Sequence, residues 1–178
     1  MSADTNTSAP DVGAHGPAPG PVRPSAAFMR QRLSRLVAFG FGAGLSPVAP
    51  GTVGTLWAWA AWLVMQLWLP EPVMLLLLPV AFVVGVWACG RTAQAMGVAD
   101  HGAMVWDEVV AFWLVLAMVP AGFGAQFAAF VLFRLFDIVK PPPIRHFDAT
   151  VPGGFGVMFD DLLAAFYTLL VIALWKVL

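Results

Sequence analysis

Carboxylate side chains are concentrated in one part of an otherwise apolar chain. Most of the ten Asp and Glu residues fall between residues 100 and 161: Asp100, Asp107, Glu108, Asp137, Asp148, Asp160 and Asp161. A carboxylate beside an apolar bundle is costly unless a cation lies near it, so we expect these acids to share a positive partner. Because the set contains no thiols, a hard divalent cation such as Mg²⁺ suits it.

Local spacing leaves more than one role open for these acids. If residues 100–113 form a helix, Asp100 and Asp107 share a face. Adjacent Asp107 and Glu108 would then diverge by about 100°, so that only one of them points fully into a site, and acids at a helix start also complement the helix dipole. The pair at 160–161 opens the last apolar segment, where one Asp could cap a helix, but the second would face a low-dielectric bundle.

Basic and hydroxyl residues in two further stretches could bind an anion. Arg134 and Asp137 are spaced for a surface ion pair worth under about 1 kcal/mol, whereas Lys140 and Arg145 are held apart by three prolines. Three cations beside so many acids suit an anionic substrate better than self-pairing. The glycine-rich stretch 39–59 carries hydroxyls that could join a phosphate cradle at a helix N-terminus or simply cap the next helix: Ser46, Thr52 and Thr55.

The elements that must position these side chains are apolar helices. The 178 residues are 60% hydrophobic and 11% charged, whereas soluble domains are about 25% charged, so we expect an all-α, small polytopic membrane bundle. Prolines and glycines separate about four to five hydrophobic helices, within 55–69, 73–89, 108–119, 122–136 and 161–177. The net charge of −1 gives no argument for a nucleic-acid partner.

The distribution of basic residues predicts the orientation in the membrane. If the helices pair as hairpins, seven basic residues fall on one side with the clustered acids: Arg30, Arg32, Arg35, Arg91, Arg134, Lys140 and Arg145. Glu71 and Lys176 fall on the opposite side. The basic side is the cytoplasmic one by the positive-inside tendency. Residues 1–27 are rich in Ala, Pro, Gly and Ser, so we expect a disordered tail before a membrane domain at 28–178.

Four stretches in this order resemble the phosphatidylglycerophosphatase A family. They are GAGLSPVAPGTVGT (42–55), VWDE (105–108), FRLFDIVKPPPIR (133–145) and GGFGVMFDDLLA (153–164). Each string alone is common, but four matches in order within one hydrophobic chain are specific. The resemblance extends from about Arg35 to the C-terminus. It implies an all-helical, magnesium-dependent phosphatase of the bacterial inner membrane that converts phosphatidylglycerophosphate to phosphatidylglycerol and phosphate.

On this interpretation the candidate residues take definite roles. Attack by metal-activated water is favoured over a phospho-aspartate intermediate, with the active site on the cytoplasmic face. Two alternatives stay open: a phosphatase of another lipid phosphomonoester, and a non-enzymatic membrane transport subunit whose acids line an ion path. The oligomeric state is not predicted. The leading metal-binding and catalytic residues are Asp107, Glu108, Asp160 and Asp161, with Asp100 and Asp137 as second metal candidates, and the phosphate-binding residues are Arg134, Lys140, Arg145, Thr52 and Ser46.

Overall fold

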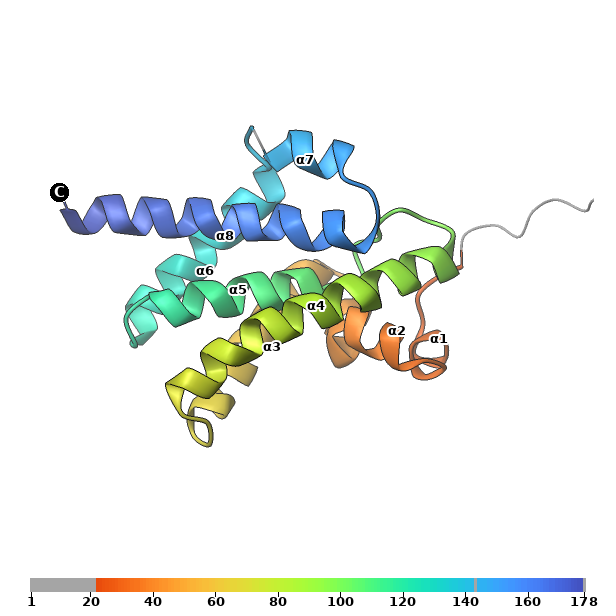
Figure 1. Cartoon of the computed structure of the whole chain (residues 1–178), viewed down its shortest axis with the longest axis horizontal. Helices are drawn as coiled ribbons and strands as arrows, with labels where there is room; N and C mark the ends of the chain where they lie inside the picture. Colours follow the sequence, from red (N-terminus) through yellow and green to blue (C-terminus); the bar gives the residue numbers. More distant parts are fainter. Residues whose placement is uncertain (1–21, 143, 178) are drawn as a thin grey trace, which may run out of the picture.

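The protein is helical throughout the residues described by the computed structural model, 22–142 and 144–177, and no strand occurs among them. Short connections join the helices in the order shown in Figure 1. They are α1 Ala26–Arg30, α2 Leu33–Ala38, the 3₁₀ helix η1 Gly40–Leu45, α3 Pro50–Gln66, α4 Glu71–Met96, α5 Trp106–Met118, α6 Phe123–Val139, α7 Ile144–Thr150 and α8 Gly153–Val177.

The described residues begin within the segment that the sequence analysis assigned to the tail. The predicted disordered tail lies mostly outside the described residues, which start at Val22. The backbone N–H of Val22 donates to the carbonyl of Met96 at 3.2 Å. Helix α1 then starts at Ala26, where the Ser25 side chain accepts from the Phe28 N–H. A side-chain cap of this kind satisfies one of the free amides at a helix start, so residues 22–27 belong to the folded domain.

Helix α5 is the central element of the bundle. It packs against α3, α4 and α8, while α8 also contacts α4, α6 and α7. Val109, Phe112 and Val115 on α5 are fully buried. Two indole N–H groups fix the helix laterally, because Trp106 donates to the Ala81 carbonyl at 3.0 Å and Trp113 donates to the Ala58 carbonyl at 2.9 Å. Helix α5, whose first turn carries the first pair of acids, is therefore held by hydrogen bonds to both α4 and α3.

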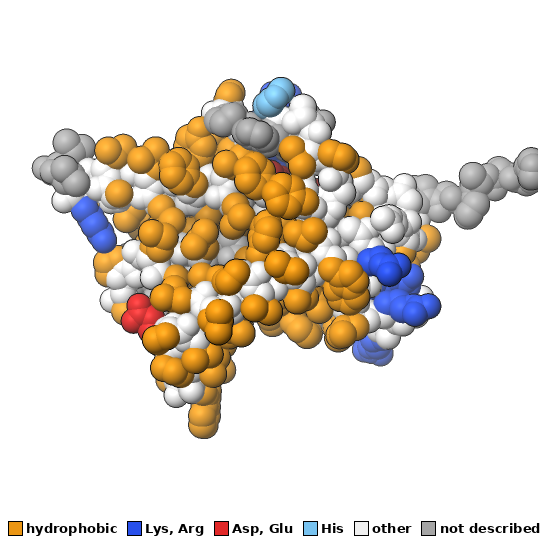
Figure 2. All heavy atoms as spheres, in the orientation of Figure 1, with side chains coloured by type: hydrophobic (Ala, Val, Ile, Leu, Met, Phe, Trp, Pro, Cys, Tyr) orange, Lys and Arg blue, Asp and Glu red, His pale blue; other side chains and the backbone are white. Residues whose placement is uncertain are grey.

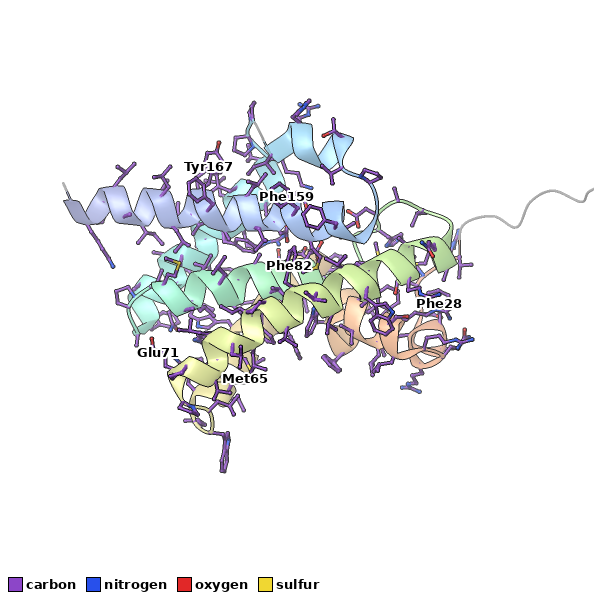
Figure 3. All side chains as sticks on the ribbon, viewed as in Figure 1. Phe28, Met65, Glu71, Phe82, Phe159 and Tyr167 are labelled. Carbon is purple, nitrogen blue, oxygen red and sulfur yellow. The ribbon has the colours of Figure 1, made fainter. Side chains whose placement is uncertain are left out.

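The outer surface of the bundle is strongly apolar. Figure 2 shows hydrophobic side chains over most of this face, with Lys and Arg gathered at the end where α1 and α2 lie. Glu71 and the C-terminus lie at the opposite end (Figures 1 and 3). Two helices, Glu71–Met96 and Gly153–Lys176, are long and apolar enough to cross a membrane by length and composition. The remaining predicted apolar segments are also helices, but shorter ones.

The start of α8 departs from the prediction. The helix begins at Gly153, so Asp160 and Asp161 lie two turns inside it and cannot cap it. A Cβ on Gly154 would lie 2.0 Å from the Val86 carbonyl oxygen of α4. Glycine here permits close contact between two helices, as small residues do at helix–helix interfaces in membranes. The glycine-rich residues before Asp160 thus form the packed first turns of the helix, which was predicted to open at residues 160–161.

Candidate metal and phosphate site

Three carboxylates from α5 and α8 converge inside the bundle. Asp107, Glu108 and Asp161 each offer an oxygen atom, and these atoms all lie within 4.8 Å of one another. Asp107 and Glu108 occupy the first turn of α5, and Asp161 lies on the third turn of α8. The expectation that only one of Asp107 and Glu108 points into the site is wrong, because the longer Glu108 side chain reaches the same point.

The free oxygens of this group fit a divalent cation. One buried oxygen on each of the three side chains has no hydrogen-bond partner: Asp107 Oδ1, Glu108 Oε2 and Asp161 Oδ2. Buried polar atoms in folded proteins are nearly always satisfied, and buried like charges without compensation are strongly destabilising. Oxygen-only ligands at this spacing suit Mg²⁺, which binds carboxylates and keeps several waters.

Arg134 of α6 lies at the edge of the carboxylate group. Its Nη1 is 2.7 Å from Asp137 Oδ2, 3.5 Å from Glu108 Oε1 and 3.3 Å from Thr55 Oγ1. The pair with Asp137 forms as the spacing allowed, but it is largely buried and includes Glu108, unlike the surface pair considered from the sequence. Arg134 therefore orients two acids, and the Nη1 of the guanidinium that was predicted to bind phosphate contacts protein groups.

The N-terminus of α3 closes the site on another side. A Cβ on Gly51 would lie 2.2 Å from Glu108 Oε1 and 2.9 Å from Arg134 Nη2. Thr55, which is fully buried, donates to the Gly51 carbonyl at 2.8 Å and accepts from Arg134. Sequence reasoning considered Thr55 only as a cap or cradle hydroxyl. Its spacing of four from Gly51 was the available signal, because it places both residues on one helix face.

The second aspartate of α8 has a different partner. Asp160 is buried and forms an ion pair with Lys140, the residue that ends α6 in a left-handed conformation with φ 45°. Arg145 lies on α7 and is exposed. Lys140 and Arg145 thus provide positive charge at the end of α6 and on α7, two elements that pack against α8.

Two of the candidate residues make local contacts with neighbouring backbone groups, and a third follows Gly51 in the chain. Asp100 is in the loop before α5, where its Oδ1 accepts from the His101 N–H at 2.6 Å. The helix expected over 100–113 starts only at Trp106, so Asp100 and Asp107 share no helix face. Ser46 closes a local turn with the backbone of Val48. Thr52 lies one residue after Gly51 and is half-buried.

Together these residues can hold a hard cation and a phosphate group. Carboxylates of α5 and α8 would bind the ion, and cations on α6 and α7 would bind phosphate oxygens by charge-assisted hydrogen bonds. The arrangement is typical of sites that cleave phosphate esters, in which metal and side-chain cations stabilise the phosphoryl group.

Comparisons with known proteins agree with this chemistry. Residues 36–176 match the family model described as Phosphatidylglycerophosphatase A. Phosphatidylglycerophosphatase A of Escherichia coli is 46% identical over 130 residues, which cover 72% of this chain and 75% of that protein. The Haemophilus influenzae protein of the same name is 44% identical, over 77% of this chain and 85% of the relative. A Bacteroides thetaiotaomicron protein named provisionally as a phosphatidylinositol-3-phosphatase is 39% identical, over 79% and 92%. No solved structure matches the chain.

Proposed function

The chain belongs to the phosphatidylglycerophosphatase A family and is a phosphatase of phosphatidylglycerol synthesis, and we propose that it removes the phosphate at the carboxylates of α5 and α8 with Mg²⁺ as cofactor. The observation that carries this proposal is the convergence of Asp107, Glu108 and Asp161 with one partnerless buried oxygen each. A buried group of three acids has no structural value of its own, because desolvation and mutual repulsion both oppose it.

The carboxylates would divide the work with the neighbouring cations. Asp107, Glu108 and Asp161 would hold the ion, and a bound Mg²⁺ would supply charge to neutralise phosphoryl oxygens and would lower the pKa of an attacking water. Asp160 completes the acidic wall and keeps Lys140 at its rim. Arg134, through its contacts with Glu108 and Asp137, fixes the geometry of the ligands. Asp137 is thereby a supporting residue, and the proposal does not use Asp100 and Ser46, whose side chains bond to neighbouring backbone groups.

The substrate phosphate would be bound by the exposed and rim cations. Lys140 and Arg145 are the proposed phosphate-binding residues, with Thr52 and the backbone at the start of α3 as the opposite wall. A helix N-terminus offers free N–H groups and positive potential to an anion. The substrate we propose is phosphatidylglycerophosphate, whose terminal phosphate monoester would enter between these groups and leave phosphatidylglycerol.

We further propose that the protein is a multi-pass protein of the bacterial inner membrane with its site on the cytoplasmic face. Helices α4 and α8 are long and apolar enough to span. The starts of α5 and α8, the end of α4 and the short α1 and α2 lie at one end of the molecule, where Lys and Arg gather (Figures 1 and 2). Basic residues of this kind mark the cytoplasmic side, which therefore also holds the carboxylates.

A phosphatase specific for another lipid phosphomonoester is the second candidate. The observation that favours it is the Bacteroides thetaiotaomicron relative, whose name refers to a phosphoinositide. A transport subunit fits poorly, because its acids should follow a path along the helices. Here the three clustered acids occupy one level of the bundle.

The test is phosphate release from defined lipids in mixed micelles. Purified protein is given phosphatidylglycerophosphate, phosphatidylinositol 3-phosphate or phosphatidic acid, each with Mg²⁺ or with EDTA. We expect release from phosphatidylglycerophosphate, its loss in EDTA and its return when Mg²⁺ is added in excess. Faster turnover of another lipid would reassign the substrate, and full activity in EDTA would remove the metal from the proposal.

A further inference from the structure

An apolar groove lies between α6 and α8 on the side of the bundle away from the basic end. Its volume is about 470 Å³. The two helices contact each other, and Figure 1 shows α6 crossing α8 obliquely, so their far halves diverge. The connection after α5 adds Val119 and Pro120, and the lining residues of the two helices are Ala125, Ala128, Leu132, Val171, Ile172, Trp175 and, at the C-terminal end of α8, Lys176.

The groove continues one face of α8 that begins at the proposed site. Asp160, Tyr167, Val171 and Trp175 follow one another at spacings of seven, four and four, which places them on the same side of the helix. The eleven residues from Asp160 to Val171 span about 16 Å, and those from Asp160 to Trp175 span about 22 Å.

The facing side of α6 has the matching order. Lys140, Phe136, Leu132 and Ala128 are each four residues apart, so they also share a side. These faces of α6 and α8 meet in a seam, and the Lys140–Asp160 ion pair lies at the end of the seam near the proposed site. Below it the rings of Phe136 and Tyr167 meet with centroids 5.6 Å apart. The small side chains of Ala128 and Ala125 follow and leave the groove open.

The aromatic contact separates the polar head of the seam from its apolar part. Tyr167 projects from the side of α8 near the turn after α6, and its hydroxyl donates to the Pro142 carbonyl at 3.1 Å (Figure 3). A ring with one apolar face and one polar end suits the depth at which a lipid changes from headgroup to chain. The seam therefore presents cations, then an amphipathic ring, then apolar walls.

We infer that this groove binds the distal part of one acyl chain of the phospholipid substrate while its phosphate lies at Lys140 and Arg145. The inference rests on the proposed function, because it takes the substrate to be a membrane phosphomonoester cleaved at the carboxylates of α5 and α8. The order of chemistry along the seam matches such an amphiphile from Lys140 to Trp175, and Lys176 lines the groove beyond that point. Its length matches too, since half of a hydrocarbon core is about 15 Å thick.

Because the groove is remote from the phosphate-binding residues, it would distinguish substrates by acyl-chain length and not by headgroup. Chains of a dioctanoyl lipid are half as long as those of a dipalmitoyl lipid, so we expect them to end before the groove. Lipid tails and groove walls are equally apolar, so binding depends on packing in the groove and not on transfer from water. Filling the groove should therefore affect the long-chain substrate only.

The experiment compares KM for dioctanoyl and dipalmitoyl phosphatidylglycerophosphate in mixed micelles at fixed mole fraction with Mg²⁺. Ala128→Phe fills the groove from an exposed position on α6. We expect KM for the dipalmitoyl lipid to rise about tenfold, the lower end of what a hydrophobic pocket achieves for one methylene. KM for the dioctanoyl lipid should stay at the wild-type value, which also shows that the variant is folded.

The matched control is Ala60→Phe, at an exposed position on α3 outside the groove, and both of its KM values should equal those of the wild type. Ala128→Leu, a smaller obstruction, should shift the ratio of the two KM values in the same direction. A wild-type ratio in both Ala128 variants overturns the inference. Absence of dioctanoyl turnover by the wild-type protein in Mg²⁺ would instead overturn the proposed function, so the two failures are distinguishable.

Discussion

Gly51 of α3 lies so close to Glu108 of α5 that a Cβ on the glycine would be 2.2 Å from Glu108 Oε1. Gly51 is buried in the first turn of α3, and the same Cβ would meet both terminal nitrogens of Arg134. The close approach lets one helix N-terminus, one carboxylate and one guanidinium occupy the same small volume. The site thus depends on a residue without a functional group.

Gly51→Ala is expected to lower kcat by about 10²-fold, because a displacement of about 1 Å in a catalytic group can cost that much. The methyl group must push Glu108 and Arg134 aside. Gly124→Ala on α6 is the matched control, since its Cβ meets nothing within 4 Å, and its kcat should be unchanged. Phosphate-release kinetics of the two variants measure the difference. Equal kcat values would show that Glu108 is not held where the chemistry occurs.

Asp161→Asn should lower activity by at least about 10²-fold, the scale on which loss of supporting metal contacts acts. In EDTA the variant should unfold at a higher temperature than the wild type, because one of the clustered buried charges is gone. Added Mg²⁺ should raise the unfolding temperature of the wild type and leave that of the variant unchanged. Thermal unfolding in detergent with and without Mg²⁺ gives a readout independent of turnover. A wild-type Mg²⁺ shift in the variant would take Asp161 out of the metal site.

Thr55→Val removes the hydroxyl that accepts from Arg134 while keeping the shape of the side chain. We expect the free energy of unfolding to fall by about 1–3 kcal/mol, because a buried donor loses its partner. The kcat should fall with it, since Arg134 positions Glu108. Thr55→Ser keeps the hydroxyl and should recover most of kcat. Identical kcat values for Val and Ser would assign Thr55 to packing alone.

Arg145→Ala is expected to raise KM about tenfold with little change in kcat, through loss of a charge-assisted contact worth about 1.5–3 kcal/mol. The residue is exposed on α7, so the fold should not change. Arg91→Ala, an exposed arginine on α4, removes the same charge from the basic end and should leave KM within twofold, roughly the error of an exposed charge effect. If both variants raise KM equally, the effect comes from general attraction to the micelle surface and not from a phosphate contact.

The apolar segments and their order were predictable from composition, whereas two helix starts were not. The last helix was predicted to open at residues 160–161, and the glycines before them argued against an earlier start because glycine is a poor helix former in isolation. In the bundle, Gly154 packs against the backbone of α4, and tertiary contact outweighs propensity. At Asp100 the difference has the opposite sign: the helix considered over residues 100–113 does not extend to its first residues. There Asp100 binds the neighbouring backbone N–H instead, and the helix starts six residues later.

The residue types of the site were also predictable, but their partners were not. Motif order indicated that acids of residues 105–108 and 153–164 act together, and the structure brings Asp107, Glu108 and Asp161 within reach of one ion. The spacing indicated the Arg134–Asp137 pair, but no local pattern indicated that Arg134 would also contact Glu108 and Thr55, which lie on α5 and α3, many residues away. The same applies to Lys140, which meets Asp160 only through the α6–α8 contact.

The measurement closest to the central claim is anomalous diffraction from crystals grown with Mn²⁺, which replaces Mg²⁺ at oxygen sites. One anomalous peak is expected among Asp107, Glu108 and Asp161. Its distance to the coordinating oxygen should be about 2.0–2.3 Å, whether that oxygen belongs to a carboxylate or to a water that bridges to one. Crystals of Asp161→Asn should lose that peak. Three carboxylates without a peak at saturating Mn²⁺, or a peak at Asp100 in the loop before α5, would contradict the account.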